Sequence, residues 1–298
     1  MMTGLLPLMM LVGVGGLVRH QLPENAWRGL DRLNFTYFFP ALLFLAASQR
    51  KLTLDDVSAI APLVWATIAV TLLVGYGARR FGPEKYLDFA GCWQTTWRFN
   101  AGIGFIAVSA LDKGNMAIYA VVVGMAVPVS NACAVSVLSL GEQQDWFEMA
   151  KKVLLNPFFV SSLFGVSFAL FGLSLPFLVT RPLEMLSQPA ITIALISVGA
   201  TMNWGALSKM DSFSLFINAT KLLVMPACVV GLALAFAQNG GLTQTLIMYA
   251  ALPTAAASHV LAGALGADQR LSATMVAQST LLSAITLPVW IVLANMFF

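Results

Sequence analysis

The chain has 298 residues, of which 59% are hydrophobic and only 10% are charged. Soluble domains carry about 25% charged residues, so this composition excludes an ordinary soluble protein and predicts one embedded in a lipid bilayer. The net charge of +3 is spread over short polar links, and no basic tract suits a nucleic-acid partner. The two histidines lie far apart and the three cysteines lack a C-x-x-C spacing, so no metal, cofactor or enzymatic centre is expected.

The apolar residues fall in about ten blocks of roughly 16–25 residues, the length that a helix needs to cross a bilayer. We therefore predict an all-α membrane protein with ten transmembrane helices. No basic residue precedes the first block, which indicates a first span rather than a cleaved signal peptide. The expected spans, numbered 1 to 10, cover residues 5–18, 33–47, 57–78, 87–110, 116–138, 156–173, 183–201, 213–237, 242–265 and 271–297.

The basic residues between the spans are unevenly distributed. Ten of them follow odd-numbered spans and four follow even-numbered spans. Because positively charged links tend to stay in the cytoplasm, this bias predicts a multi-pass protein of the cell inner (plasma) membrane. Both termini are then expected on the extracytoplasmic side.

Span 4 carries polar and small residues in the middle of an apolar block. From Gln94 to Gly104 it reads Gln-Thr-Thr-Trp-Arg-Phe-Asn-Ala-Gly-Ile-Gly. A cation at the membrane centre is costly, which makes Arg98 a functional candidate. The two glycines weaken the helix, and many transporters build their substrate site at such a break. We therefore expect span 4 to be interrupted at Asn100.

The two halves of the chain share weak sequence matches in the same order. Because each half would hold five spans, an odd number, the second half must be upside down relative to the first. This predicts a 5+5 inverted repeat, with residues 1–140 (spans 1–5) and 141–298 (spans 6–10) as its halves. The matching segments are 30–34 with 183–187, 110–112 with 264–266, and 127–129 with 287–289, at offsets of 153, 154 and 160.

Span 9 should carry the partner of the break in span 4. Its centre contains Pro253, which cannot donate a backbone hydrogen bond, followed by a run of small residues. At 1.5 Å per residue, Asn100 lies roughly 18 Å into span 4 and Pro253 about 17 Å into span 9. Two crossed, broken helices would aim positive dipole ends at one spot near the midplane, where Arg98 adds a full charge. The expected ligand is an anion, most simply a carboxylate.

These motifs resemble the auxin efflux carrier family, and the resemblance covers essentially the whole chain. It implies a scaffold of spans 1, 2, 6 and 7 and a mobile transport domain of spans 3–5 and 8–10. It also implies elevator-type alternating access and a homodimer through the scaffold helices. The motifs that carry the resemblance are Arg98–Gly104, Phe39–Phe44, Pro253–Ala255 and Val260–Ala262.

Departures from the family pattern occur at the site. Many members have Asn-Thr-Gly where this chain has Asn100-Ala101-Gly102, and an aromatic or other bulky residue is commoner where this chain has His259. Ala256 and Ala257 stand where many members carry a polar residue. The substrate of a better-known relative is therefore not transferred.

The candidate substrate contacts gather at the two breaks. Arg98 is expected to bind the substrate carboxylate, with neutralisation of helix C-termini as its alternative role. His259 is either hydrogen-bonded inside the bundle or a pH-sensitive gate, and Lys221 is expected to snorkel to the membrane interface. The predicted substrate-binding residues are Arg98, Asn100, Ala101, Gly102, Pro253, Thr254, Thr96, Ser258, His259 and Gln278.

Transport of small organic anions across the membrane is the first functional hypothesis. The substrates considered are malonate- or malate-like dicarboxylates and auxin-like aromatic monocarboxylates, with a single site guanidinium favouring the latter slightly. A sodium-coupled symporter resembling bile-acid carriers is the second hypothesis, although no Asp or Glu lies near the middle of a span. A membrane sensor is the third, and it is disfavoured because no output domain follows.

Overall fold

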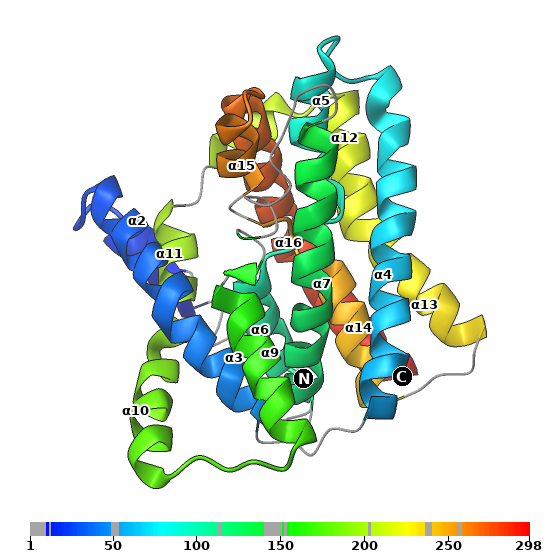
Figure 1. Cartoon of the computed structure of the whole chain (residues 1–298). Helices are drawn as coiled ribbons and strands as arrows, with labels where there is room; N and C mark the ends of the chain where they lie inside the picture. Colours follow the sequence, from blue (N-terminus) through cyan, green and yellow to red (C-terminus); the bar gives the residue numbers. More distant parts are fainter. Residues whose placement is uncertain are drawn as a thin grey trace.

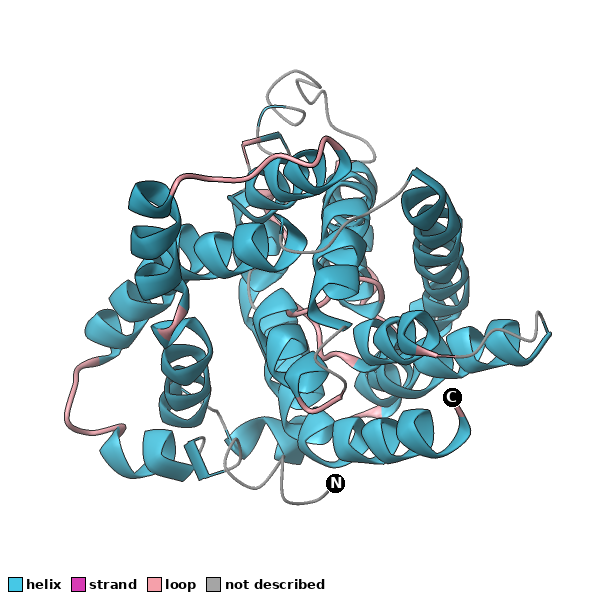
Figure 2. Ribbon diagram, turned by 90° about the horizontal axis from the view of Figure 1, so that it is seen from below, coloured by secondary structure: helices cyan, strands magenta, loops and turns pink. Residues whose placement is uncertain are grey.

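The computed structural model describes residues 10–11, 13–48, 54–111, 115–139, 151, 154–155, 157–201, 204–235, 240–255 and 258–298 (Figure 1). Every element in these residues is helical, and Figure 2 shows helices joined by loops. The predicted all-α class is therefore confirmed. Four described helices are long and apolar enough to cross a bilayer by themselves: Ser58–Arg80, Met116–Leu138, Ser212–Ala235 and Gln269–Phe297.

The predicted span 2 is one continuous helix that begins earlier than its hydrophobic block. It consists of α2 (Glu24–Leu33), the π-helical turn η1 (Asn34–Phe38) and α3 (Phe39–Ser48). The sequence prediction missed α2, because the span was identified from its apolar block and α2 carries charged residues. The wide turn η1 lies directly before Pro40, whose missing N–H interrupts the ordinary hydrogen-bond pattern.

The predicted span 7 consists of two helices. α10 (Phe177–Ser187) ends before Gln188 and α11 (Pro189–Thr201) begins at a proline. Proline is tolerated in the first turn of a helix but clashes inside one, which accounts for the new start. α3 packs against α10 and against α9 (Pro157–Leu170), while α11 packs against α2. We call α2, η1, α3, α9, α10 and α11 the first helix group.

The remaining elements form the second helix group, which lies beside the first in Figure 1. α4 packs against α7 and α13, and α14 packs against α7, α13 and α16. The two groups meet where α7 contacts α3 and α9 and where α6 contacts α11. The second group comprises α4 (Leu54–Tyr76), η2 (Gly77–Arg80), α5 (Tyr86–Trp93), η3 (Gln94–Thr96), α6 (Ala101–Ser109), α7 (Asn115–Leu138), η4 (Trp204–Lys209), α12 (Ser212–Ala219), η5 (Thr220–Val224), α13 (Met225–Ala235), α14 (Gly241–Ala251), α15 (Ser258–Ala264) and α16 (Gln269–Phe297).

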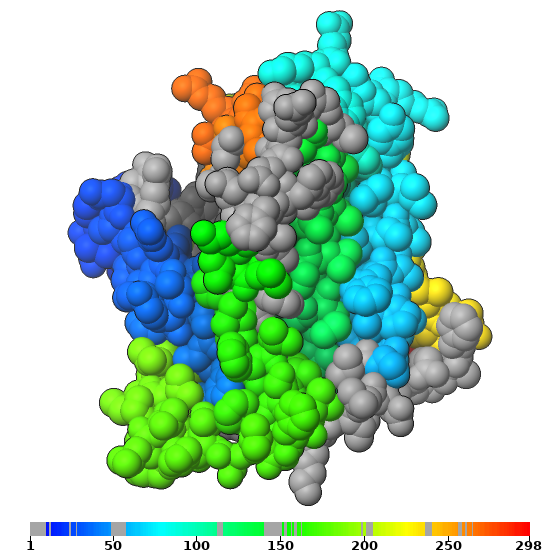
Figure 3. Space-filling model, viewed as in Figure 1, coloured from blue at the N-terminus to red at the C-terminus, as the bar shows by residue number. Residues whose placement is uncertain are grey.

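Large apolar side chains are exposed on the outside of the helices. α9 and α10 cover the lower part of the face seen in Figure 3. Their side chains Phe164, Phe177 and Leu178 are among the exposed ones, and that of Leu178 is 84% exposed. Exposed apolar side chains of this size suit contact with lipid.

Candidate functional site: two helix breaks that meet

Span 4 is interrupted where its sequence predicts a break. α5 passes into the short 3-10 turn η3, residues 97–100 are not helical, and a new helix, α6, begins at Ala101. Asn100 caps this helix, because its backbone is extended and its side-chain Oδ1 accepts a hydrogen bond from the N–H of Ile103 at 3.2 Å. The first turn of α6 therefore starts inside the protein.

Span 9 is interrupted in a matching way. α14 ends at Ala251, and Leu252 adopts an extended conformation with ψ of 145°. A residue before proline avoids the helical region, so Pro253 accounts for the end of α14. Residues 252–255 are not helical, and α15 begins at Ser258. Ala256 and Ala257, which the family comparison singled out, lie outside the described residues.

The two breaks are in direct contact. The backbone N–H of Asn100 donates to the carbonyl oxygen of Pro253 at 2.8 Å. A second link joins the side chain of Gln94, which donates through Nε2 to the carbonyl oxygen of Ser258 at 3.0 Å. The predicted meeting of the interrupted helices is thus confirmed. These bonds also satisfy backbone groups that the breaks release, which is the condition for irregular backbone inside a membrane protein.

Arg98 lies inside the bundle, with a side chain that is only 8% exposed. One guanidinium nitrogen donates to Gln94 Oε1 and another to Asn131 Oδ1 on α7, both at 3.0 Å. Both partners are neutral amides, and the ion pairs of the described residues do not include Arg98. The positive charge is therefore held in place without being neutralised, and guanidinium donors remain for a carboxylate.

Two buried hydroxyl groups lie at the second break. Thr254 Oγ1 and Ser258 Oγ have no hydrogen-bond partner among the described residues, and both residues are 0% exposed. An unpaired buried polar group costs about 1–3 kcal/mol, so it commonly marks a place where a ligand binds. The backbone N–H of Thr254 is already satisfied by Ser279 Oγ on α16, at 2.9 Å. Ser279 was not among the predicted site residues, since a serine in a long apolar helix has no distinguishing pattern.

The first helix group covers the start of α6. A Cβ on Gly102 would lie 2.9 Å from Cζ of Phe39, a residue of α3. The ring of Phe39 also stacks on Phe105 of α6, with 5.8 Å between the ring centroids. Phe39 belongs to one of the family motifs, so this motif brings an aromatic ring against the break from the other helix group.

The other predicted site residues have diverse surroundings. Ala101 accepts a hydrogen bond from Tyr119 through its carbonyl oxygen, and His259 is partly buried in the first turn of α15. Thr96 donates its hydroxyl to carbonyl oxygens of Trp93 and of Thr71 on α4. These bonds direct Thr96 toward α4 rather than toward the breaks.

The hydrogen bonds of Gln278 direct its side chain toward α12 and η4 rather than toward the breaks. Its Oε1 accepts from Asn218 of α12 at 3.1 Å, and its Nε2 donates to the carbonyl oxygen of Ala206 at 3.0 Å.

Lys221, in η5, is 1% exposed. The prediction that Lys221 snorkels to the interface is wrong, because its side chain packs inside the protein instead.

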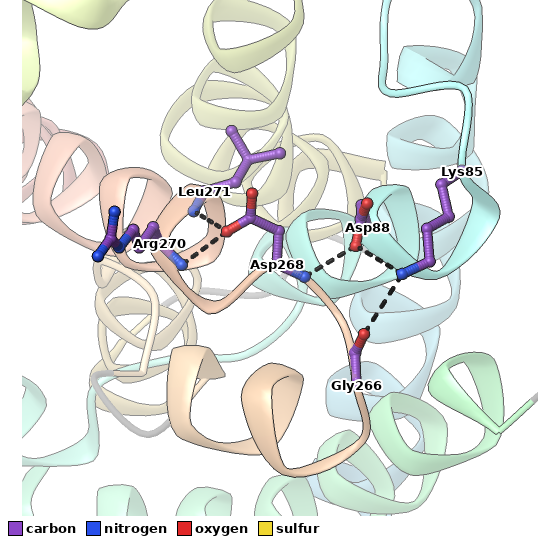
Figure 4. A network of polar contacts seen from close by, with 6 residues as sticks. All are labelled: Lys85, Asp88, Gly266, Asp268, Arg270 and Leu271. Atoms are coloured by element: carbon purple, nitrogen blue, oxygen red, sulfur yellow. Dashed lines mark hydrogen bonds and ion pairs between the residues drawn. The ribbon is translucent and has the colours of Figure 1, made fainter.

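The outer end of α5 is tied to the loop between α15 and α16 (Figure 4). Asp88 Oδ1 accepts the backbone N–H of Asp268 at 2.8 Å and lies 3.7 Å from Lys85 Nζ. Asp268 in turn caps α16 by accepting the N–H groups of Arg270 and Leu271. The half-helices of the two breaks are therefore connected at their far ends as well as at the crossing.

Replacing Asp88 with alanine is expected to lower the free energy of unfolding by about 1 kcal/mol, the typical contribution of one hydrogen bond. The measurement is the melting temperature of the purified protein in detergent. Glu184→Ala serves as the control, because it removes the exposed pair of Arg181 with Glu184 at 3.1 Å, and exposed pairs contribute little. Equal melting temperatures for the two variants would contradict a connecting role for Asp88.

Among the described residues, no three His, Cys, Asp or Glu side chains come together as ligands for a metal ion. The groups that gather at the breaks are a guanidinium, neutral amides, hydroxyls and the backbone. This set of donors suits an anion.

Comparison with known proteins places the chain among transporters. Residues 146–291 match the model of a family described as membrane transport protein. Over 287 residues the chain is 25% identical to an "Uncharacterized transporter" of Methanothermobacter thermautotrophicus, and the match covers 90% of this chain and 89% of that protein. Over 139 residues it is 28% identical to a "Putative malonate transporter" of Rhizobium meliloti, covering 46% of this chain and 43% of that protein.

Proposed function

Since the chain belongs to the auxin efflux carrier family of membrane transport proteins, we propose that it carries small organic carboxylates across the bilayer at the crossing of its two broken helices. The single observation that supports this most is the 2.8 Å hydrogen bond between Asn100 and Pro253, beside the uncompensated charge of Arg98. Broken helices that meet inside a membrane protein are a common basis of transporter sites.

The two helix groups serve different purposes in this proposal. The first group, with span 1, is the scaffold, and the second group is the transport domain that moves against it. The halves 1–140 and 141–298 are the inverted repeats from which both are built. The crossing supports this division, since it lies within the second group and is covered by Phe39 from the first. Movement of the second group past Phe39 would uncover the site by elevator-type alternating access.

The chemistry of the crossing favours an anion with few charges. The start of α6 supplies a positive dipole end, Arg98 supplies a full charge, and Thr254 and Ser258 supply hydroxyl groups. A carboxylate uses all of these groups as donors. The name of the Rhizobium relative makes malonate the first substrate to test, with aromatic monocarboxylates as the second class.

The test is uptake of radiolabelled malonate into proteoliposomes, with liposomes lacking protein as the background. Benzoate-type acids are offered as competitors, and sodium is replaced by choline in a parallel series. Uptake above background that competing carboxylates inhibit is the expected result. Uptake of none of these acids would refute the proposed function, and a requirement for sodium would favour the symporter that resembles bile-acid carriers.

Asn100→Ala is expected to lower uptake roughly tenfold or more. The substitution removes the cap of α6, which costs about 0.5–2 kcal/mol, and also removes a polar side chain at the crossing. The control is Ser187→Ala in α10, which removes a hydrogen bond from the serine hydroxyl to the carbonyl oxygen of Glu184. If both variants keep their melting temperatures within a few degrees and lose uptake equally, the special role of Asn100 is refuted.

A further inference from the structure

A lysine side chain is enclosed in the middle of the helix α12–η5–α13. Lys221 is 1% exposed, and its Nζ lies 3.0 Å from Sδ of Met225, one turn further along. A thioether sulfur is a weak acceptor, so the ammonium form would keep two N–H groups unsatisfied. A buried ammonium without an anionic partner is strongly unfavourable, whereas a neutral amine is tolerated.

Among the side chains that the structure describes, none supplies a carboxylate to Lys221. η5 contacts α4, α12, α13, α14, α16 and η3. Among the described side chains no Asp or Glu lies within ion-pair distance of its Nζ, and the side chains of the two aspartates that begin α4 lie outside the described ones. The titratable or charged groups on these elements and their caps are Tyr76, Asp211, Cys228, Tyr249, Asp268 and Arg270.

A row of polar residues leads from the exposed start of α12 to this lysine. Asp211, Ser214, Asn218 and Lys221 follow one another at spacings of three, four and three, which places them along one face of the helix. Asp211 and Ser214 are joined by two hydrogen bonds of 2.8 Å, and Asn218 Nδ2 donates to the carbonyl oxygen of Ser214 at 2.8 Å. Asn218 Oδ1 is buried and has no partner among the described residues, one turn before Lys221.

Lys221 lies in a helical segment that packs against the elements around the two breaks. Three of the elements that contact η5 also frame the two breaks: η3 precedes the break at Asn100, α14 ends just before Pro253, and α16 carries Ser279 against Thr254. Moreover, Trp290 of α16 donates its indole N–H to the carbonyl oxygen of Leu222 at 2.9 Å. The site where the carboxylate binds and Lys221 therefore belong to the same set of packed helices, so a change of charge at the crossing can affect Lys221.

We propose that Lys221 is a proton-binding site inside the moving helix group, which takes up a proton when a carboxylate binds at the crossing and thereby couples transport to the proton gradient. This inference rests on the proposed function. With the site empty, the enclosed Lys221 has no anionic partner among the described side chains and stays a neutral amine. A bound carboxylate brings negative charge into the helix group that holds Lys221, and protonation of the amine becomes favourable.

The proton step is balanced without any further reactant. On one side of the membrane, a hydronium ion gives its proton to the lone pair of Lys221 Nζ, so an O–H bond breaks and an N–H bond forms. On the other side, after the carboxylate has left, the ammonium returns the proton to water. With a dicarboxylate bound, its two negative charges balance the positive charges of Arg98 and protonated Lys221, so the loaded helix group carries no net charge from these groups.

The experiment uses the wild-type protein and Lys221→Met, a change that keeps a long unbranched side chain beside Met225. Proteoliposomes receive labelled malonate with the outside one pH unit more acidic than the inside, and protein-free liposomes correct for diffusion of the free acid. One proton per substrate corresponds to accumulation up to about tenfold for one pH unit. Wild type is expected to accumulate malonate, whereas Lys221→Met is expected only to equilibrate it.

Lys209→Met is the matched control, because Lys209 is an exposed lysine in the neighbouring turn η4. It is expected to accumulate malonate like wild type. Accumulation by Lys221→Met equal to wild type would overturn the proposal, as would wild-type uptake that ignores the pH gradient. Neither result would contradict the proposed function, which is refuted only if the wild-type protein transports no carboxylate.

A second measurement applies if Lys221→Met and Lys221→Gln do not fold. Purified wild-type protein in weakly buffered detergent solution is mixed with malonate, and a pH indicator follows proton exchange. Uptake of about one proton per malonate bound is expected, after correction for the protonation of malonate itself. Binding of malonate without proton uptake would overturn the proposal.

Discussion

Arg98→Gln is expected to reduce carboxylate uptake by about 30-fold or more while the protein stays folded. Glutamine keeps an amide that can bond to Gln94 and Asn131, but it removes the only charge that we place at the crossing. Losing one partner of a buried, hydrogen-bonded charge pair costs about 2–5 kcal/mol, and each 1.4 kcal/mol is a factor of ten. Uptake of labelled malonate in proteoliposomes, together with the melting temperature in detergent, measures both effects.

Arg98→Lys separates charge from geometry in the same assay. Lysine keeps the positive charge but lacks the planar fork that contacts two amide oxygens at once, so partial activity is expected. Arg181→Gln is the control, because Arg181 is an exposed arginine of α10 that pairs with Glu184. Uptake by Arg98→Gln within twofold of the Arg181→Gln control would show that the substrate does not depend on Arg98.

Gly104→Ala is expected to destabilise the protein by about 2–4 kcal/mol and to abolish uptake. A Cβ at this position would lie 1.8 Å from the Tyr119 hydroxyl and 2.7 Å from Cδ1 of Leu252, next to the second break. The Tyr119 ring is fully buried and donates to the carbonyl oxygen of Ala101 at 3.0 Å, so it has little room to move. Overpacking of a core costs about 1–3 kcal/mol, and the lost hydrogen bond adds about 1 kcal/mol.

The matched control for this variant is Gly231→Ala in α13. A Cβ on Gly231 would meet no atom within 4 Å, so the same substitution there adds helix propensity without a clash. Its melting temperature is expected to stay equal to wild type or to rise slightly. If Gly104→Ala were as stable as Gly231→Ala, the close approach of the two breaks at Gly104 would be refuted.

The position of both helix breaks followed from local chemistry. Asn100 is a good capping residue, and Pro253 disfavours a helical residue before it. Gly102 and Gly104, which were expected to weaken the helix, instead lie inside α6, where they allow other side chains to come close. The properties of Asn100 and Pro253 belong to single residues and act through the nearest turn of backbone, so a sequence expresses them directly. The distance of each break along its span then placed both at similar depth, and their contact through Asn100 and Pro253 agrees with that expectation.

The partners of the polar side chains were far less predictable. Thr96 and Gln278 were chosen for their polarity, yet their hydrogen bonds run to α4, to α12 and to Ala206. Ser279 has the same polarity and lies one position further along α16, where it reaches Thr254. Adjacent residues of a helix point about 100° apart, so which of them faces the crossing depends on how the helix is rotated against its neighbours.

The burial of Lys221 could not be predicted from the sequence either. A lysine eight or nine residues inside an apolar block is compatible with snorkelling, and only the packing of α12–η5–α13 against α4, α14 and α16 encloses it. The chain's own residues established a helical membrane protein with two interrupted spans, because apolar length, capping and proline act locally. Which side chains became buried, hydrogen-bonded or left with an unpaired charge depended on contacts between separate helices, whose bonded residues lie 25 to 72 positions apart in the chain. No local pattern encodes such contacts.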